Sequence, residues 1–362
     1  MGLRAGTLEG VAMTFWHQKR VLLTGHTGFK GAWAARWLAH AGAQVTGLSL
    51  APDQTPNLFD ILGQAHLAQS HLVDLRDTAA VAQVVAAARP EIVLHMAAQP
   101  LVRQGYTDPV GTFSSNVMGT VHLLDALRHT SDLRAVLVVT SDKVYENSGT
   151  HVALTETDRL GGADPYSASK AATEIVVAAM RQAFFQASGV RVATARGGNV
   201  VGGGDFSADR LVPDIIRAAQ SGQPLALRAP NATRPWQHVL DCLSGYFTFV
   251  EALLTNNGLP ETLNFGPNDD GPHQSVAQVA EAMQQALGTK IRWHHDLRPA
   301  PAEKPHLSID SRAARHLLGW QPRLDSHATL AWTAEWYSAQ QQGADLAALT
   351  DAQITRYQEL AS

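Results

Sequence analysis

Short apolar runs alternate with longer amphipathic segments through the first half of the chain. The runs are four to six residues long and rich in β-branched residues, which favours buried strands; they cover 20–23, 45–50, 70–73, 91–95, 135–140 and 190–195. The segments between them carry apolar residues at helical spacing; they include 32–38, 77–88, 110–129 and 166–186. Strands that alternate with helices predict an α/β fold built on a parallel sheet.

The pattern changes after Arg196, where a glycine-rich loop covers 197–205. Helical segments are expected near 209–221, 237–254, 275–287 and 310–318 and after Asp325, with a short strand at 262–265. We therefore expect a flexible tail at 1–14, a first domain at 15–200 with return segments near 237–270, and a smaller α/β lobe with a helical tail at 201–362.

Composition narrows the class of protein. The net charge is −4, so no basic excess marks the chain for nucleic acid or a membrane surface. Cys242 is the single cysteine and the histidines are scattered, so neither a disulfide nor a metal site is expected. No apolar run reaches membrane-spanning length, and residues 1–14 lack the pattern of a signal peptide; the cytoplasm is the expected compartment.

The first strand leads into a glycine turn, VLLTGHTGFKG, and then into a helix. Glycines here let the backbone approach a phosphate, and the helix N-terminus offers unpaired N–H groups, so the context favours a dinucleotide site over a plain tight turn. His26 stands where the simplest fingerprint has its second glycine. The candidate contacts are Gly25, Thr27, Gly28, Phe29, Lys30 and Gly31.

The next two strands bear on which dinucleotide binds. Ser49 and Leu50 end the second strand, where this fold usually carries an acid for the adenosine ribose, and the first acid is Asp53. No Lys or Arg lies between Gln44 and His71 to meet a 2′-phosphate, which favours NAD over NADP. Asp74 follows the third strand and is expected either to bind adenine or to cap the helix at 77–88.

Further candidates follow the fourth and fifth strands. Small residues at Ala97 and Ala98, followed by Gln99, allow close approach to a cofactor. The fifth strand delivers Ser141 to the carboxyl edge of the sheet, where ligands bind in such folds. Tyr166 and Lys170 share one helix face, and a lysine cation is expected to lower the tyrosine pKa and make it a base. The alternative is a surface tyrosine–lysine pair.

The motifs TGHTGFKG, HMAAQPLVR, NVMGT, TSDKVY, DPYSASK, GGNVVGGGD and RPWQHV together resemble the extended short-chain dehydrogenase/reductase family over about residues 15–325. The resemblance implies a Rossmann-type domain of about seven strands that binds NAD tightly, and a smaller lobe for a nucleotide sugar. It implies that Lys170 holds the nicotinamide ribose and that Asn116 supports Lys170 through water. It also implies a homodimer or homotetramer that pairs through the helices carrying Asn116 and Tyr166.

Within the family, Asp142-Lys143 resembles the pair found in nucleotide-sugar 4,6-dehydratases that act on CDP-glucose. The resemblance implies that Lys143 removes the C5 proton, or relays it, while Asp142 protonates the departing C6 hydroxyl. From the residues alone, Asp142 is otherwise a turn cap, and Lys143 a solvated lysine or ion-pair partner. The alternatives for the whole chain are a nucleotide-sugar 4-epimerase and a non-enzymatic regulator that binds NAD.

For the substrate, the resemblance carries Asn199 and Arg234 to the nucleotide diphosphate, where the planar fork of arginine suits paired phosphate oxygens. Arg210 and Arg312 are further candidates that fit a helix-surface charge equally well. Gln99 and Arg103 are expected near the hexose. Backbone groups of 225–228 are expected to frame the base.

Overall fold

Seven parallel strands form the centre of the molecule, as the sequence predicts. The computed structural model describes residues 13–147, 149, 152–267, 274–298 and 306–360. The sheet order is β10-β6-β5-β4-β1-β2-β3. The strands are β1 (Arg20–Thr24), β2 (Gln44–Ser49), β3 (Gln69–Leu72), β4 (Ile92–His95), β5 (Ala135–Val139), β6 (Arg191–Gly197) and β10 (Thr262–Phe265).

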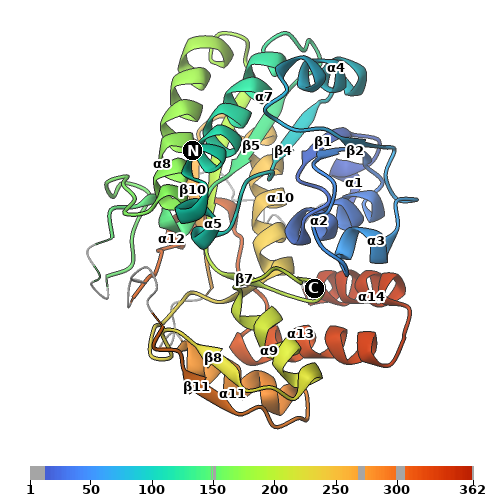
Figure 1. Ribbon diagram of the computed structural model, residues 1–362. Helices are drawn as coiled ribbons and strands as arrows, with labels where there is room; N and C mark the ends of the chain where they lie inside the picture. Colours follow the sequence, from blue (N-terminus) through green and yellow to red (C-terminus); the bar gives the residue numbers. More distant parts are fainter. Residues whose placement is uncertain (1–12, 148, 150–151, 268–273, 299–305, 361–362) are drawn as a thin grey trace, which may run out of the picture.

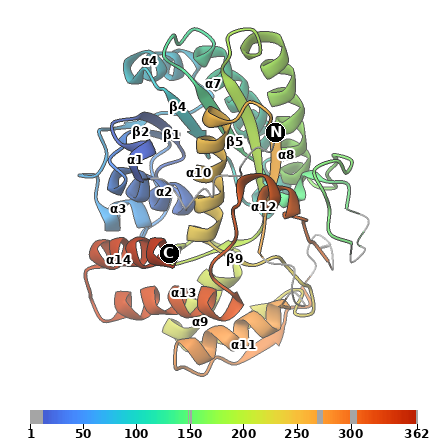
Figure 2. The same ribbon diagram turned by 180° about the vertical axis from the view of Figure 1, so that it is seen from behind.

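Successive strand residues face opposite sides of the sheet, and each side has its own core. Leu22, Val93 and Val136 pack beneath α4 (Thr78–Ala88), α7 (Gly119–Leu127) and α8 (Pro165–Met180). Leu23, Leu94 and Leu137 pack on the other side, under α2 (Phe29–His40) and α10 (Val239–Thr255). The two views in Figures 1 and 2 show these helix layers on either side of the strands. Burial on both faces explains why the strands read as continuous apolar runs.

Two of the predicted helices contain a π-helical turn, the first within the helix and the second at its end. The segment expected at 110–129 consists of α6 (Pro109–Phe113), η1 (Ser114–Met118, π) and α7. The helix expected at 166–186 consists of α8 and η3 (Arg181–Phe185, π). A π turn inserts an extra residue without breaking the helix, and apolar periodicity does not reveal it.

The smaller lobe lies below the sheet in Figure 1. It contains a two-stranded parallel sheet, β8 (Leu225–Leu227) with β11 (Trp293–His295), packed with α9 (Leu211–Ser221), α11 (Val276–Ala286) and α13 (Ser326–Gln341). The chain also returns to the first domain. α12 (Arg312–Leu318) packs on β10, and α14 (Leu346–Glu359) packs on α2 and α3 (Leu58–Leu62).

The remaining elements are short. They are α5 (Val102–Thr107), the 3₁₀ turn η2 (Asp142–Val144), and the paired two-residue strands β7 (Val200–Val201) and β9 (Gln237–His238). Because β7 lies within the glycine-rich loop at 197–205, that loop is not wholly irregular. The expected tail at 1–14 lies outside the described residues up to residue 12, and α1 (Met13–Trp16) then begins. Trp16 is buried and donates a 2.5 Å hydrogen bond to Glu251 on α10. Among the described helices, none has the length and apolar character needed to span a membrane.

Candidate active site

A cavity of about 1900 Å³ runs along the carboxyl edge of the sheet, between the sheet and the smaller lobe. The ends of β1, β4 and β5 form its floor, and α9 and β8 contribute its opposite wall. The sheet order reverses between β4 and β1, because the chain leaves the β3 edge and restarts beside β1. In open α/β sheets this reversal opens a crevice for ligands.

The glycine turn fills the crevice between β1 and β4. Gly25 has a φ of +80°, and a Cβ there would lie 2.8 Å from the backbone nitrogen of Ala97. A Cβ on Gly31 would lie 2.0 Å from the Gly25 carbonyl oxygen, so the turn and α2 pack too closely for any side chain. The N-cap of α2 is Gly28, which supplies no side-chain cap. The first-turn N–H groups therefore lack a capping side chain of their own.

His26 points away from the cavity. It is fully buried, its Nε2 lies 2.8 Å from Ser70 Oγ, and burial lowers its pKa to about 4. Its neighbour Thr27 does line the cavity, with Oγ1 2.8 Å from Ser49 Oγ. The departure from the glycine fingerprint thus places a neutral imidazole under β2 and β3.

Asp74 lines the cavity and is not the cap of α4. Asp77 has that role, since it accepts a 3.0 Å hydrogen bond from Ala80 N. The Asp74 carboxylate instead binds the Arg76 guanidinium, with 2.9 Å from Nε to Oδ2, and this contact lowers its pKa. The first of the two sequence-based alternatives, a contact with the cofactor, stays a prediction.

Asn116 holds a loop and does not line the cavity itself. Its Oδ1 accepts a 2.7 Å bond from Gln99 N, and its Nδ2 donates to Gln99 O and to Ser169 Oγ. The Gln99 side chain is also engaged, because it donates to Thr112 Oγ1 and accepts from Leu101 N. Asn116 is therefore not placed to contact a cofactor directly. The loop that it fixes, Ala97 to Gln99, does line the cavity.

Ser141, Asp142 and Lys143 form one connected group at the end of β5. Ser141 Oγ donates to Asp142 Oδ1 at 2.9 Å, and Lys143 Nζ lies 3.2 Å from the same oxygen. The Asp142 side chain is only 1% exposed, whereas 28% of Lys143 is exposed. Within the part of the chain that the structure describes, Asp142 Oδ2 is buried and has no hydrogen-bond partner. A buried carboxylate oxygen without a hydrogen-bond partner costs free energy. Such atoms are common at sites where a side chain acts on a ligand.

Tyr166 and Lys170 lie beside this group, and both are buried. Lys170 Nζ donates to the Val139 carbonyl at 3.1 Å, and burial lowers its pKa to about 8, with Lys30 acting in the same direction. The expectation of a lowered tyrosine pKa is wrong for this structure. Burial raises the Tyr166 pKa, and the groups that oppose burial are the Lys143 charge and a hydrogen bond with Ser141.

Asn199 and Arg234, the candidates for the diphosphate, both line the cavity. Asn199 Oδ1 accepts from Lys143 Nζ at 3.3 Å, which connects the loop after β6 to the group at the end of β5. Arg234 is 8% exposed and donates from Nη1 to the Thr233 carbonyl at 2.8 Å.

Arg103 takes part in a bridge that sequence reasoning missed. Arg103 and Arg228 donate to the same oxygen of Asp209, Oδ1, at 2.8 and 3.0 Å. The three residues come from α5, the end of β8 and the loop before α9, and all line the cavity. Arg210 also lines it, 3.7 Å from Asp205. The positive φ of Asp209, +59°, is a signal that only the structure provides.

Arg312 lies outside the cavity, contrary to the expectation of a substrate contact. It stands at the start of α12, with Nε 2.7 Å from Asp310 Oδ2, and its side chain is 79% exposed. The local turn Asp310-Ser311-Arg312 closes on itself, which is the helix-surface alternative.

Comparison with known proteins decides the family. Residues 21–266 match the NAD dependent epimerase/dehydratase family. The chain belongs to this family. It is 41% identical over 349 residues to the CDP-glucose 4,6-dehydratase of Salmonella typhimurium, covering 95% of this chain and 97% of that protein. It is 28% identical to the dTDP-glucose 4,6-dehydratase of Xanthomonas campestris pv. campestris, covering 88% and 93%.

Solved structures of epimerases and dehydratases share the fold. The UDP-glucose-4-epimerase of Stenotrophomonas maltophila, with bound NAD and formylated UDP-arabinopyranose, superposes with a TM-score of 0.79 at 23% identity, over 90% of this chain and all of that one. The dTDP-glucose 4,6-dehydratase of Bacillus anthracis, in complex with NAD, gives 0.74 at 20% identity, over 90% and 98%. These likenesses confirm the Rossmann-type fold that the sequence predicts.

The cavity of this epimerase/dehydratase family member fits NAD. The uncapped start of α2 suits a pyrophosphate, and a Cβ on Gly28 would meet only Gly25 O, at 3.4 Å. The rim at the end of β2 is lined by residues 49–54, which include no Lys or Arg. This surface accepts an unmodified ribose and offers no cation to a 2′-phosphate.

Proposed function

We propose that the protein is a nucleotide-sugar 4,6-dehydratase that converts CDP-glucose to CDP-4-keto-6-deoxyglucose. One observation carries the proposal. The Asp142–Lys143 pair, with an unpartnered buried carboxylate oxygen, lies next to Ser141 and Tyr166. Oxidation and epimerisation at C4 need a base beside the sugar hydroxyl, but they need no second acid–base pair. Elimination of water from C5 and C6 does need one.

Tyr166 begins the proposed reaction by removing the proton of the C4 hydroxyl. The glycine turn and Lys170 would hold NAD, which would supply the hydride acceptor for C4 and the hydride donor for C6. Because burial raises the Tyr166 pKa, the phenolate needs the Lys143 charge and the Ser141 hydroxyl that stabilise it. Ser141 also orients the reacting hydroxyl.

Once Tyr166 is protonated, Lys143 passes a proton to Asp142 Oδ1, 3.2 Å away, and becomes neutral. The ketone at C4 makes the C5 proton acidic, and the neutral Lys143 Nζ takes it. Asp142 gives the proton that it received to the C6 hydroxyl, which leaves as water, and Lys143, whose ammonium protons exchange with solvent, then gives a proton to C5. Over one turnover Tyr166 has gained a proton and Lys143 has lost one, while Asp142 is restored. Ser141 lies beside Tyr166, and its Oγ donates at 2.9 Å to Asp142 Oδ1, the oxygen that Lys143 Nζ contacts, so its hydroxyl offers the path that returns the proton.

The diphosphate of the substrate would bind at Arg234 and Asn199, with Arg210 and Arg103 nearer the loop before α9. Arg234 is nearly buried, and a charge-assisted bond from a buried arginine to phosphate is among the stronger polar contacts. The choice of CDP-glucose over other nucleotide hexoses is supported by the 41% identical dehydratase.

The experiment is mass spectrometry of the products from CDP-, dTDP-, UDP- and GDP-glucose. The proposal predicts a product lighter by one water, with the highest kcat/KM for CDP-glucose. A product of unchanged mass with inverted C4 would establish the epimerase alternative. NAD binding without turnover of any nucleotide hexose would establish the regulator.

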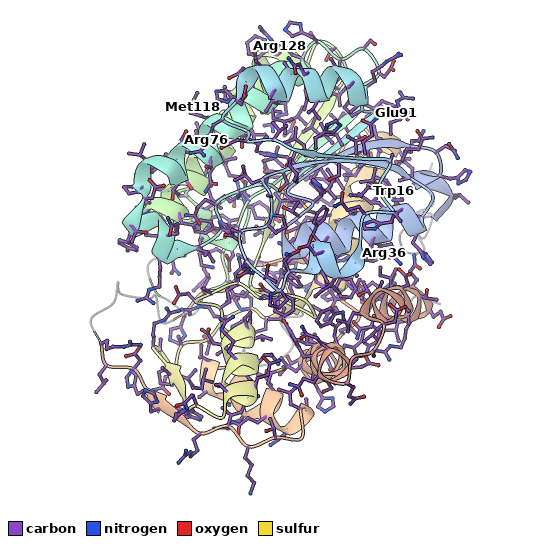
Figure 3. All side chains as sticks on the ribbon, turned by 45° about the vertical axis from the view of Figure 1, so that its right-hand side comes forward. Trp16, Arg36, Arg76, Glu91, Met118 and Arg128 are labelled. Atoms are coloured by element: carbon purple, nitrogen blue, oxygen red, sulfur yellow. The ribbon has the colours of Figure 1, made fainter. Side chains whose placement is uncertain are left out.

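We also propose that two copies pair through the helix layer of α6, η1 and α8. Four apolar side chains are exposed there, Val110, Phe113, Met118 and Ile175, and Phe184 is exposed on η3, which continues α8. Figure 3 shows Met118 at the outer surface of this layer. Val110 is 79% and Ile175 61% exposed, which a second copy would cover. Light scattering should give a dimer or tetramer, and Val110→Glu with Ile175→Glu should yield monomers.

A further inference from the structure

A buried ion pair lies behind the cavity and takes no part in the proposed reaction. Glu174 on α8 and Arg196 on β6 join through Oε2 and Nη2 at 2.9 Å, with side chains 4% and 5% exposed. Neither residue lines the cavity. Burying two charges costs much of what their attraction returns, so such a pair is weak evidence for stability alone. Its other contacts indicate what it does.

The carboxylate of Glu174 holds the end of β5. Its Oε1 accepts a 2.5 Å hydrogen bond from Thr140 Oγ1, and its Oε2 accepts one of 2.8 Å from Thr194 Oγ1. Thr140 is the residue immediately before Ser141. The carboxylate therefore fixes the point at which the chain enters the reactive segment Ser141 to Val144.

The guanidinium of Arg196 holds the other end of the same segment. Its Nη1 donates to Tyr145 Oη at 2.8 Å, and its charge lies 4.9 Å from the centre of the Tyr145 ring. Tyr145 Oη in turn donates to Asn264 on β10 at 2.6 Å. Tyr145 directly follows η2, so both ends of the segment that carries Asp142 and Lys143 meet one buried ion pair.

We propose that Glu174 and Arg196 are positioning residues that fix Ser141, Asp142 and Lys143 from behind, and that the Glu174 carboxylate also acts on Lys170 from one helical turn away. The inference rests on the proposed function for the role of those side chains. It assigns no contact with substrate to either residue of the pair.

The effect on Lys170 follows from the charges around it. Glu174 is one helical turn further along α8, Lys30 faces Lys170 from α2, and His95 faces it from β4. His95 is neutral at working pH, because burial lowers its pKa to about 3. Burial and Lys30 lower the Lys170 pKa to about 8, and Glu174 opposes them. Removing the negative charge must lower this pKa further, whereas removing the Arg196 cation must not.

The test compares Glu174→Gln with Arg196→Gln across pH, with CDP-glucose as substrate. Each variant loses the contact that holds one end of the segment Ser141 to Val144. We therefore expect kcat to fall at least about tenfold while KM stays within about threefold. Under the proposed function the Lys170 cation holds the cofactor, so activity should be lost as pH rises through the Lys170 pKa. The alkaline limb of kcat should move to lower pH in Glu174→Gln and should not do so in Arg196→Gln.

Asp241→Asn is the matched control, because Asp241 is another fully buried carboxylate. It accepts bonds from Tyr357 Oη at 2.7 Å and from Arg323 N at 2.6 Å, far along the chain from Lys170. Its loss should lower the melting temperature and leave the alkaline limb in place. A purely structural ion pair would behave like this control. If the alkaline limb of the kcat profile stays at the same pH in all three variants, the proposal is wrong.

Two milder variants keep the test decisive if the pair is needed for folding. Thr140→Val and Tyr145→Phe each remove one hydroxyl and preserve volume, and each should lower kcat about threefold or more with little change in KM. Unchanged kcat in both variants would contradict the claim that Glu174 and Arg196 position this segment. The Lys170 titration is also measurable without turnover, by NMR of ¹³C-methylated lysines in the full chain. A lower Lys170 midpoint in Glu174→Gln would support the pair's role even if CDP-glucose were not the substrate.

Discussion

The two sides of the cavity are built differently. On the sheet side, Ser141 and Asp142 follow β5, Tyr166 and Lys170 lie in the first two turns of α8, and all four are less than a tenth exposed. On the opposite side, the lobe side, a partly exposed bridge joins Arg103 of the first domain to Asp209 and Arg228 of the lobe, and Arg234 is the buried exception there. Arg103, Asp209 and Arg228 have side chains 48%, 39% and 28% exposed.

The difference separates chemistry from recognition. Buried side chains at element ends are held by backbone geometry, so their distances survive ligand binding and suit proton transfer. Exposed ion pairs contribute only about 0–1 kcal/mol each, so the arginines of the lobe side can exchange carboxylate for phosphate at little cost. Variants on the two sides should therefore affect different kinetic constants.

The largest effect is expected on the sheet side, from Tyr166→Phe. Without the phenolic oxygen, kcat should fall at least about a hundredfold, the usual scale for lost general-base catalysis. NAD affinity, measured by calorimetry, should stay close to that of the parent protein. Turnover near the parent rate would show that another group is the base, and that the sheet side does not carry the chemistry in the way proposed.

On the lobe side, Arg234→Ala should chiefly raise KM. A charge-assisted contact with phosphate is worth about 1.5–3 kcal/mol, which corresponds to a change of roughly 10- to 150-fold. Steady-state kinetics with CDP-glucose would measure it. A fall in kcat with KM unchanged would instead assign Arg234 to the chemistry.

Cofactor choice gives a smaller effect. The protein should bind NAD at least about tenfold more tightly than NADP, because residues 49–54 offer no cation to the 2′-phosphate. The charged phosphate of NADP would lose part of its hydration without gaining a partner. Calorimetric titration with each cofactor measures the ratio. Equal affinities would contradict this account of the rim.

The smallest effect is expected for the exposed bridge. Asp209→Asn keeps the shape of the side chain and removes its charge, so kcat should change by less than about threefold. Steady-state kinetics at low and physiological salt would detect it. A loss as large as that of Tyr166→Phe would show that the bridge holds the reacting groups, and that the two sides are not separable.

The sequence predicts the sheet side better than the lobe side for a physical reason. The apolar runs specify the strands, and Ser141 and Tyr166 follow because they stand at the ends of regular elements. The bridge joins Arg103 to Asp209 across 106 positions, and no periodicity encodes that approach. Arg312 was one of two substrate candidates that fitted a helix-surface charge equally well. Its pairing with Asp310 decides for the surface, and that pairing depends on turn geometry that the sequence does not show.

Burial accounts for the remaining error. The pattern Tyr166-x-x-x-Lys170 predicts a tyrosine with a lowered pKa, but desolvation dominates once the side chain is enclosed. The Glu174–Arg196 pair escaped prediction for a related reason. Nothing in the sequence shows that one turn of α8 lies against β6, or that both charges meet the ends of the segment after β5.

The most direct test of the central claim is isotope transfer in the parent protein and in Asp142→Asn and Lys143→Met. In deuterium oxide the parent protein should place solvent deuterium at C5, and deuterium supplied at C4 should appear at C6. Both variants should still oxidise C4, seen as absorbance of the reduced cofactor that persists, but they should release no water. If either variant forms the 4-keto-6-deoxy product at the parent rate, or if C5 keeps its original hydrogen, the roles given to Asp142 and Lys143 are wrong.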